Sequence, residues 1–242
     1  MKSACVFFVI LALASGSKLP EYLTKCSKSD TKLSECLLRS VKQAWPTIIK
    51  GDNSYHIAPL NPLKVPSMHV VVGDNQLIGD LYNASFHGLE NAEFKEIKWD
   101  LAKKRIDMKF FLPILNFTGD YSLFGKIIGL PLEGKGTEQV TIENMDNAHR
   151  MDYEIVEKDG HEYIEIKKTQ MTYTTSRLWV DLRNLFNGNT RLGTVMNEIM
   201  NEEWNAVNEE INPYFSNSLG EIYSQVIQAF LHKVPINEML SD

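Results

Sequence analysis

Hydrophobic and polar residues alternate along much of the middle of the chain, with the two-residue period typical of strands that bury one face. Residues 97–112 alternate on either side of an Ala-Lys-Lys-Arg turn. Residues 151–166 alternate around Asp159-Gly160, a dipeptide that favours tight hairpin turns. The same pattern continues to residue 182. It predicts a meander of antiparallel strands with a single core face.

Both ends of the chain have apolar residues at the three- and four-residue spacings of helices. The first predicted helix spans residues 33–48, with Asp30 as its cap and a kink at Pro46. A much longer helix is predicted from Thr190 onward, bent or interrupted at Pro213. Its first part alone is roughly 30 Å long, the width of a small domain. We therefore expect an α+β fold in which the antiparallel sheet curls around the C-terminal helix.

The N-terminus has the pattern of a secretory signal peptide over residues 1–17. A short basic start precedes an unbroken apolar run at 4–14, and small residues predict cleavage between Ala14 and Ser17. The run is shorter than the roughly 20 residues that a membrane-spanning helix needs. We therefore expect an exported mature chain that forms a single domain over residues 18–242, with no stable membrane insertion.

Charge and cysteine usage agree with export. The chain has 25 Lys and Arg against 31 Asp and Glu, a formal net charge of −6 without basic clusters, which argues against nucleic-acid partners. Cys5 would leave with the signal peptide, and Cys26 and Cys36 form an even pair, so a disulfide between them is expected. Asn83 and Asn116 begin N-glycosylation triplets. Asn116 is the weaker candidate because its neighbours are predicted to be buried.

Candidate catalytic and nucleotide-binding motifs are weak. Gly129 to Lys135 matches the start of a phosphate-binding loop, but Gly136 stands where Ser or Thr would hold a metal, and the residues that follow alternate like a strand. No Gly-x-Ser-x-Gly motif occurs, and the 6 histidines form no metal-binding pair. We predict no metal, no cofactor and no catalytic residue, although a Ser–His pair assembled by the fold stays open. The glycines are expected where the backbone bends or approaches closely: Gly119, Gly125, Gly129, Gly134 and Gly136.

Several motifs, in this order and spacing, resemble the takeout / juvenile-hormone-binding protein family of insects. They are the Cys26/Cys36 pair with the helix after it, Trp45-Pro46, Gly51, the Pro-rich stretch 58–66, the glycine-rich stretch 119–136, Leu185 to Gly188, Met200 to Trp204, and Pro213. The resemblance covers nearly the whole mature chain. Its hormone carriers have a second disulfide, for which this chain has no cysteines, so the takeout-like branch is favoured.

The resemblance implies a tubular lipid-binding fold: a long helix wrapped by a strongly curved antiparallel sheet around an apolar tunnel. It implies a monomeric, non-catalytic carrier of insect haemolymph that binds one elongated hydrophobic molecule, such as a juvenile hormone-like terpenoid, a long isoprenoid or a fatty acid. Two alternatives stay open: an interaction protein with a closed core, and a secreted lipid esterase.

Ligand-tunnel candidates come from the apolar faces and from the resemblance. Methionine adapts to an imperfect fit, and a tyrosine hydroxyl holds the ligand in the family's hormone carriers, which nominates Tyr121. Replacing Leu192 or Ile199 by Asp is expected to abolish uptake, because the charge would be buried in an apolar lumen. The predicted tunnel residues are Tyr121, Trp45, Met108, Met171, Leu192, Met196, Ile199 and Met200.

Overall fold

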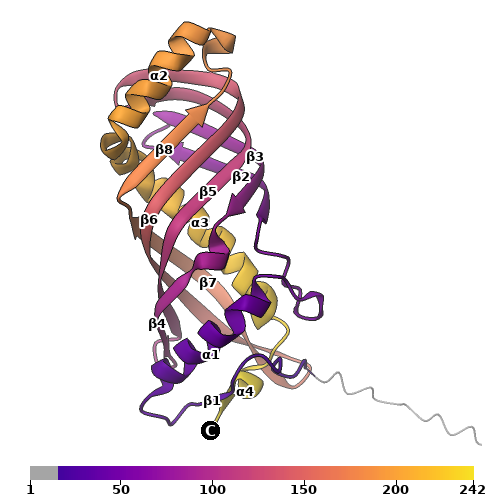
Figure 1. Cartoon of the computed structure of the whole chain (residues 1–242). Helices are drawn as coiled ribbons and strands as arrows, with labels where there is room; N and C mark the ends of the chain where they lie inside the picture. Colours follow the sequence, from indigo (N-terminus) through magenta and orange to yellow (C-terminus); the bar gives the residue numbers. More distant parts are fainter. Residues whose placement is uncertain (1–15) are drawn as a thin grey trace, which may run out of the picture.

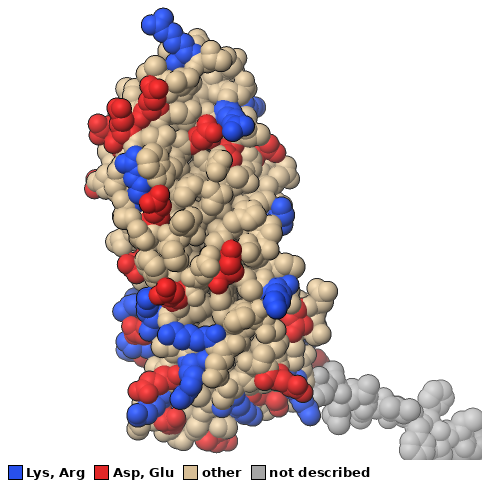
Figure 2. Space-filling model, viewed as in Figure 1, with Lys and Arg blue, Asp and Glu red and all other residues tan. Residues whose placement is uncertain are grey.

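A computed structural model of the chain describes residues 16–242. The apolar run at residues 4–14 lies outside the described residues, so the signal peptide and its cleavage stay predictions. Among residues 16–242, no helix is long and apolar enough to cross a membrane. On the face shown in Figure 2, acidic and basic side chains are interspersed.

A long antiparallel hairpin forms the centre of the sheet (Figure 1). Strand β5 (Arg105–Ile127) pairs with β6 (Leu130–Lys158) from Arg105 opposite Asp152 to Ile127 opposite Leu130. Ile128 and Gly129 make the turn with φ of 46° and 77°, so the first glycine of the apparent phosphate loop sits in a hairpin turn. Gly136 is also structural, because a Cβ there would lie 2.0 Å from the carbonyl oxygen of Arg183.

Five further strands flank this hairpin and complete a seven-stranded antiparallel sheet. Strands β4 (Glu93–Asp100) and β3 (Leu77–His87) pair with successive parts of β5, and β2 (Leu63–Val72) pairs with β3. Strands β7 (His161–Thr174) and β8 (Arg177–Leu182) pair with β6. The alternating residues therefore form the predicted hairpins, with one face of each strand toward the core.

The helices lie inside the curved sheet and at its ends (Figure 1). Helix α3 (Trp204–Leu231) packs against β7, β2 and β8, and thus runs through the interior that the sheet encloses. Helix α1 (Leu33–Ile48) packs against β4, and the short α4 (Ile236–Met239) against β7. Helix α2 (Thr190–Glu202) lies beside β8. The predicted α+β architecture, a long C-terminal helix wrapped by an antiparallel sheet, is confirmed.

Short elements complete the chain. The part of the chain that the structure describes has three single-turn 3₁₀ helices, at Asn53–Tyr55, Leu89–Asn91 and Phe186–Gly188. Strand β1 (Cys26–Ser27) pairs in parallel with β9 (Leu240–Ser241), so the two ends of the described chain meet.

The C-terminal helix breaks at a different residue from the one predicted. Glu203, with φ −92° and ψ 28°, separates α2 from α3, whereas Pro213 lies inside α3. Pro213 is exposed, so water can satisfy the carbonyl that its missing N–H leaves free. The break at Glu203 lets α2 follow the outside of the sheet while α3 enters the interior.

Helix α2 covers the free edge of β8 through two asparagines one turn apart. The Asn201 side chain accepts from the Val180 N–H and donates to its carbonyl, both at 2.8 Å. The Asn197 side chain does the same with Leu182, both at 2.9 Å. These amides replace a neighbouring strand and satisfy backbone groups that would otherwise face solvent.

Candidate ligand-binding cavities

The larger apolar cavity, cavity 1, has a volume of about 280 Å³ and lies toward the end of the molecule that contains α1 and α4. Its walls come from the N-terminal segment, α1, strands β4 to β6 and the C-terminal part of α3. Nearly all of the lining is aliphatic or aromatic; representative residues are Leu37, Ile97, Phe110, Met151, Val226 and Phe230. An apolar cavity of this size is at the lower end of the range for small-molecule sites.

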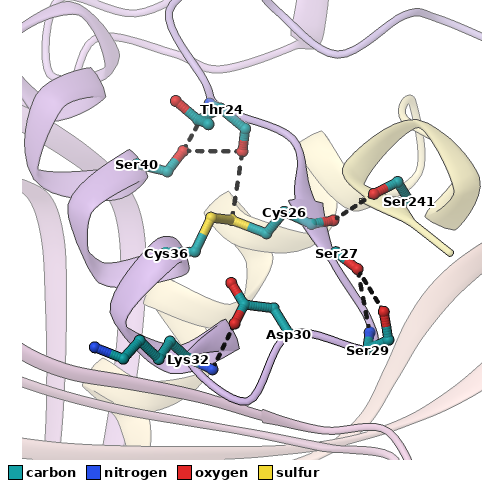
Figure 3. Close-up of a disulfide and its surroundings, with 9 residues drawn as sticks. All are labelled: Thr24, Cys26, Ser27, Ser29, Asp30, Lys32, Cys36, Ser40 and Ser241. Carbon is teal, nitrogen blue, oxygen red and sulfur yellow. Dashed lines mark hydrogen bonds between the residues drawn. A yellow bond between two sulfur atoms is a disulfide. The ribbon is translucent and has the colours of Figure 1, made fainter.

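One wall of cavity 1 is the N-terminal segment, which the disulfide attaches to α1. Cys26 and Cys36 are bonded with their Cα atoms 6.0 Å apart, which confirms the expected pairing (Figure 3). Two residues before Cys26, the N–H of Thr24 donates to Oγ of Ser40 on α1 at 2.8 Å. Because Thr24 and Ser40 also line cavity 1, these bonds fix the wall in place.

Aromatic packing stiffens another wall. The rings of Trp45 and Phe94 meet edge to face with centroids 4.9 Å apart, and Phe94 lies 6.0 Å from Phe110. The indole N–H of Trp45 donates to the carbonyl of Leu89 at 3.1 Å, so its polar atom is satisfied. Trp45 therefore presents apolar surface to the cavity.

Tyr223 on α3 is an unusual polar group beside cavity 1. Its side chain lines the cavity and lies 6.1 Å from the Phe110 ring, between centroids. Its hydroxyl is buried with no hydrogen-bond partner, and burial raises its pKa. A buried hydroxyl without a partner costs about 1–3 kcal/mol, so a ligand oxygen that reached it would supply the missing bond.

A second apolar cavity, cavity 2, has a volume of about 130 Å³ and lies farther along α3. It is lined by residues of all strands from β2 to β8 except β4, and by α2 and α3. Representative lining residues are Val70, Leu77, Phe117, Val140, Leu182 and Phe215. No residue lines both cavities. The single tunnel expected from the sequence, which would join the two cavities, stays a prediction.

Cavity 2 contains one acidic side chain, Glu138 of β6. It is 6% exposed, and its Oε1 has no hydrogen-bond partner. Burial, and to a smaller extent the charge of Asp120, raises the pKa of this carboxyl to about 8. At neutral pH the side chain is therefore mainly protonated and can donate a hydrogen bond.

The predicted tunnel residues divide into three groups. Trp45 and Met108 line cavity 1, and Met200 lines cavity 2. Three others are buried in the core and line neither cavity: Tyr121, Met171 and Met196. The remaining two, Leu192 and Ile199, are on α2 and line neither cavity.

The prediction for Leu192 needs correction, and that for Tyr121 stays a prediction. Leu192 is 50% exposed, whereas Met196 and Met200 of the same helix are buried. A charge at Leu192 would therefore face solvent, and the expected loss of uptake does not follow for that residue. The hydroxyl of Tyr121 donates to the carbonyl of Arg183 at 2.7 Å, and burial raises its pKa to about 12. Tyr121 thus ties β5 to the segment after β8.

The fold does assemble a Ser–His pair, between β6 and α3. Nε2 of His149 lies 2.6 Å from Oγ1 of Thr169 and 3.0 Å from Oγ of Ser224. Burial lowers the pKa of His149 to about 4. In residues 16–242 no hydrogen bond or ion pair joins His149 to a carboxylate, and neither His149 nor Ser224 lines either cavity. The cluster joins α3 to β6 and β7. Within the same residues, no group of three or more His, Cys, Asp or Glu is placed to hold a metal.

The two glycosylation candidates differ in exposure. Asn83 is exposed on β3, and its side-chain amide donates to Asp120 at 3.1 Å. Asn116 is half-buried on β5 and donates to Oγ1 of Thr141 at 2.8 Å. Of the neighbours expected to be buried, Leu115 and Phe117 are, whereas Ile114 is 52% exposed.

Comparison with known proteins agrees with this architecture. The model of the family described as haemolymph juvenile hormone binding protein (JHBP) matches residues 4–241. The crystal structure of Epiphyas postvittana Takeout 1 superimposes with a TM-score of 0.77 at 28% identity, covering 90% of this chain and 99% of that one. The circadian clock-controlled protein daywake of Drosophila yakuba is 22% identical over 231 residues, and that of Drosophila melanogaster 22% over 229. Each daywake match covers 90% of this chain and 87% of the relative.

Proposed function

This chain belongs to the haemolymph juvenile hormone binding protein family, and from that premise we propose that it is a secreted carrier of one elongated hydrophobic molecule. Proteins of this family are generally binding proteins without catalysis. The ligand classes that fit are a juvenile hormone-like terpenoid, a long isoprenoid and a fatty acid. Export after cleavage between Ala14 and Ser17, and a monomeric carrier, are part of the proposal. The Cys26–Cys36 disulfide supports an oxidising destination.

Cavity 1 is the observation that carries this proposal. Its lining is almost entirely apolar, so a ligand there would be held by transfer from water, at about 0.8 kcal/mol for each buried CH₂. A chain of about fifteen carbons would gain roughly 12 kcal/mol before the costs of binding, enough for useful affinity. Tyr223 would offer its hydroxyl to an oxygen of the ligand, which would orient the chain.

The first experiment is native mass spectrometry of the secreted protein, followed by organic extraction and identification of what co-purifies. We expect a stoichiometric long-chain lipid or terpenoid. An empty protein that also refuses lipophilic fluorescent probes would contradict the carrier and favour an interaction protein with a closed core. Hydrolysis of a model ester would favour the esterase instead.

Matched variants test whether cavity 1 is the site. Val226→Trp would fill the cavity from α3, whereas Val195→Trp makes the same change on α2, where Val195 is 46% exposed. We expect Val226→Trp to lose uptake of N-phenyl-1-naphthylamine while Val195→Trp retains it. Equal uptake by both folded variants would place the ligand elsewhere.

A further inference from the structure

We propose that cavity 2 is a second binding site, for an aliphatic chain that ends in a carbonyl or hydroxyl oxygen, and that Glu138 binds this oxygen. The site goes beyond the proposed carrier function, because it has its own occupant and its own polar contact. Its smaller volume, about 130 Å³ against about 280 Å³, fits a shorter ligand than the one in cavity 1.

The two cavities use different parts of α3. Val207, Ile211 and Phe215 line cavity 2, and the first α3 residue lining cavity 1 is Tyr223. Phe215 and Tyr223 are eight positions apart, which corresponds to about 12 Å of helix. Leu219, which is 0% exposed, lies between them. A ligand can therefore occupy cavity 2 without entering cavity 1.

Strand register explains why Glu138 points into cavity 2. Along β6, Glu138 alternates in phase with the buried residues Leu132, Val140 and Ile142, so its side chain faces the core. Its cross-strand neighbours are Gly119 on β5 and Leu182 on β8. Neither neighbour has a polar side chain, which leaves Oε1 without a partner.

The charges around Glu138 favour a neutral ligand oxygen. Two further carboxylates lie near this end of the sheet. The charge of Asp120 raises the pKa of Glu138, and the charge of Asp181 raises the pKa of the neighbouring Tyr121. In residues 16–242 no ion pair joins Glu138 to a cationic side chain, so the group is retained in its protonated form. A protonated carboxyl enclosed by aliphatic side chains can donate to a carbonyl or hydroxyl oxygen and gives little to a purely apolar chain.

Two substitutions separate a binding role from a structural one. Glu138→Leu removes the hydrogen bond and also removes an unsatisfied buried polar group, so the protein should become more stable while it binds ligand less well. Glu138→Gln keeps an N–H donor and should retain binding. If Glu138 only supported the fold, stability and binding would fall together in Glu138→Leu.

The test is isothermal titration calorimetry with 2-decanone, in the background of Val226→Trp so that cavity 1 is filled. We expect 2-decanone to bind this background, Glu138→Leu to weaken binding about tenfold or more, and Glu138→Gln to restore most of it. The alkane n-decane should bind with and without Glu138 alike.

Two results would overturn the proposal. One is no 2-decanone binding to Val226→Trp, which would confine ligands to cavity 1. The other is unchanged affinity in Glu138→Leu, which would make the carboxyl irrelevant to binding. Loss of N-phenyl-1-naphthylamine uptake in Val226→Trp but not in Val195→Trp tests cavity 1 separately, so failure of the second site and failure of the carrier function are distinguishable.

Discussion

Glu138 should control how the stability of the protein changes between pH 4.5 and pH 8. The carboxyl has a pKa of about 8 in the folded protein and an ordinary value of 4.5 when exposed. In this interval the folded protein holds a proton that the unfolded chain has released, so stability falls as pH rises. At about 1.4 kcal/mol per pH unit the full effect is about 5 kcal/mol, and relaxation around the charged carboxylate reduces it to about 3–5 kcal/mol.

His149 acts in the opposite direction over part of the same range. Its pKa is about 4 in the folded protein and 6.5 when exposed, so between these values the folded protein holds one proton fewer than the unfolded chain. Stability from His149 is therefore present above pH 6.5 and is lost as pH falls toward 4. The two effects oppose each other from pH 4.5 to 6.5, and above pH 6.5 Glu138 acts alone.

Urea unfolding at intervals from pH 4 to 8.5, followed by tryptophan fluorescence, measures both effects. We expect Glu138→Gln to gain stability relative to the unsubstituted protein steadily from pH 4.5 to 8, reaching about 3–5 kcal/mol. The difference should be constant below pH 4.5, and His149→Gln should show the opposite trend from pH 6.5 to 4. A stability difference for Glu138→Gln that does not change with pH would refute the reasoning, because it would mean that Glu138 titrates alike in both states.

Three further predictions follow from the fold. Cys36→Ser should destabilise the protein by about 3 kcal/mol in urea unfolding. It should also speed the loss of bound probe, because the N-terminal wall of cavity 1 is no longer attached to α1. Unchanged retention of the probe would mean that the disulfide does not hold this wall in place. Asn201→Ala should cost about 1–3 kcal/mol by leaving backbone groups of β8 unpaired, whereas the exposed Asn205→Ala should cost under about 0.5 kcal/mol, and equal losses would refute the role of the amide in covering the strand edge. Glycosidase treatment of the secreted protein should lower its mass in the Asn116→Gln variant but not in Asn83→Gln, and the reverse result would show that Asn116 carries the glycan.

The strands and hairpins were predictable because each alternating stretch encodes which face it buries. The break at Glu203 was not, because it depends on where α2 leaves the surface and α3 enters the interior. Leu192 was misplaced for a related reason: a helical apolar pattern says that a face is apolar, but not whether that face is covered. Glu138 could have been noticed, since a charged residue in phase with Val140 and Ile142 is an exception to an otherwise apolar row.

The cavities themselves could not be predicted from sequence. A cavity is the space that packing leaves unfilled, and it depends on residues far apart in the chain, such as Leu19, Phe94 and Phe230 around cavity 1. Methionine content suggested an adaptable interior, but only some methionines face the cavities. Met108 does so and Met171 does not, although both lie on strands of the core.

The parallel pairing of Cys26 with Leu240 affects how this protein is made. Leu19 and Met239 both line cavity 1 although they are 220 positions apart in sequence, so the cavity is complete only after residues 239–241 have left the ribosome. Until then this part of the wall of cavity 1 is missing. Many sheet contacts also join residues distant in sequence, which slows folding. A chain that ended before residue 239 would lack the β9 pairing and part of this wall, and would present apolar surface to chaperones.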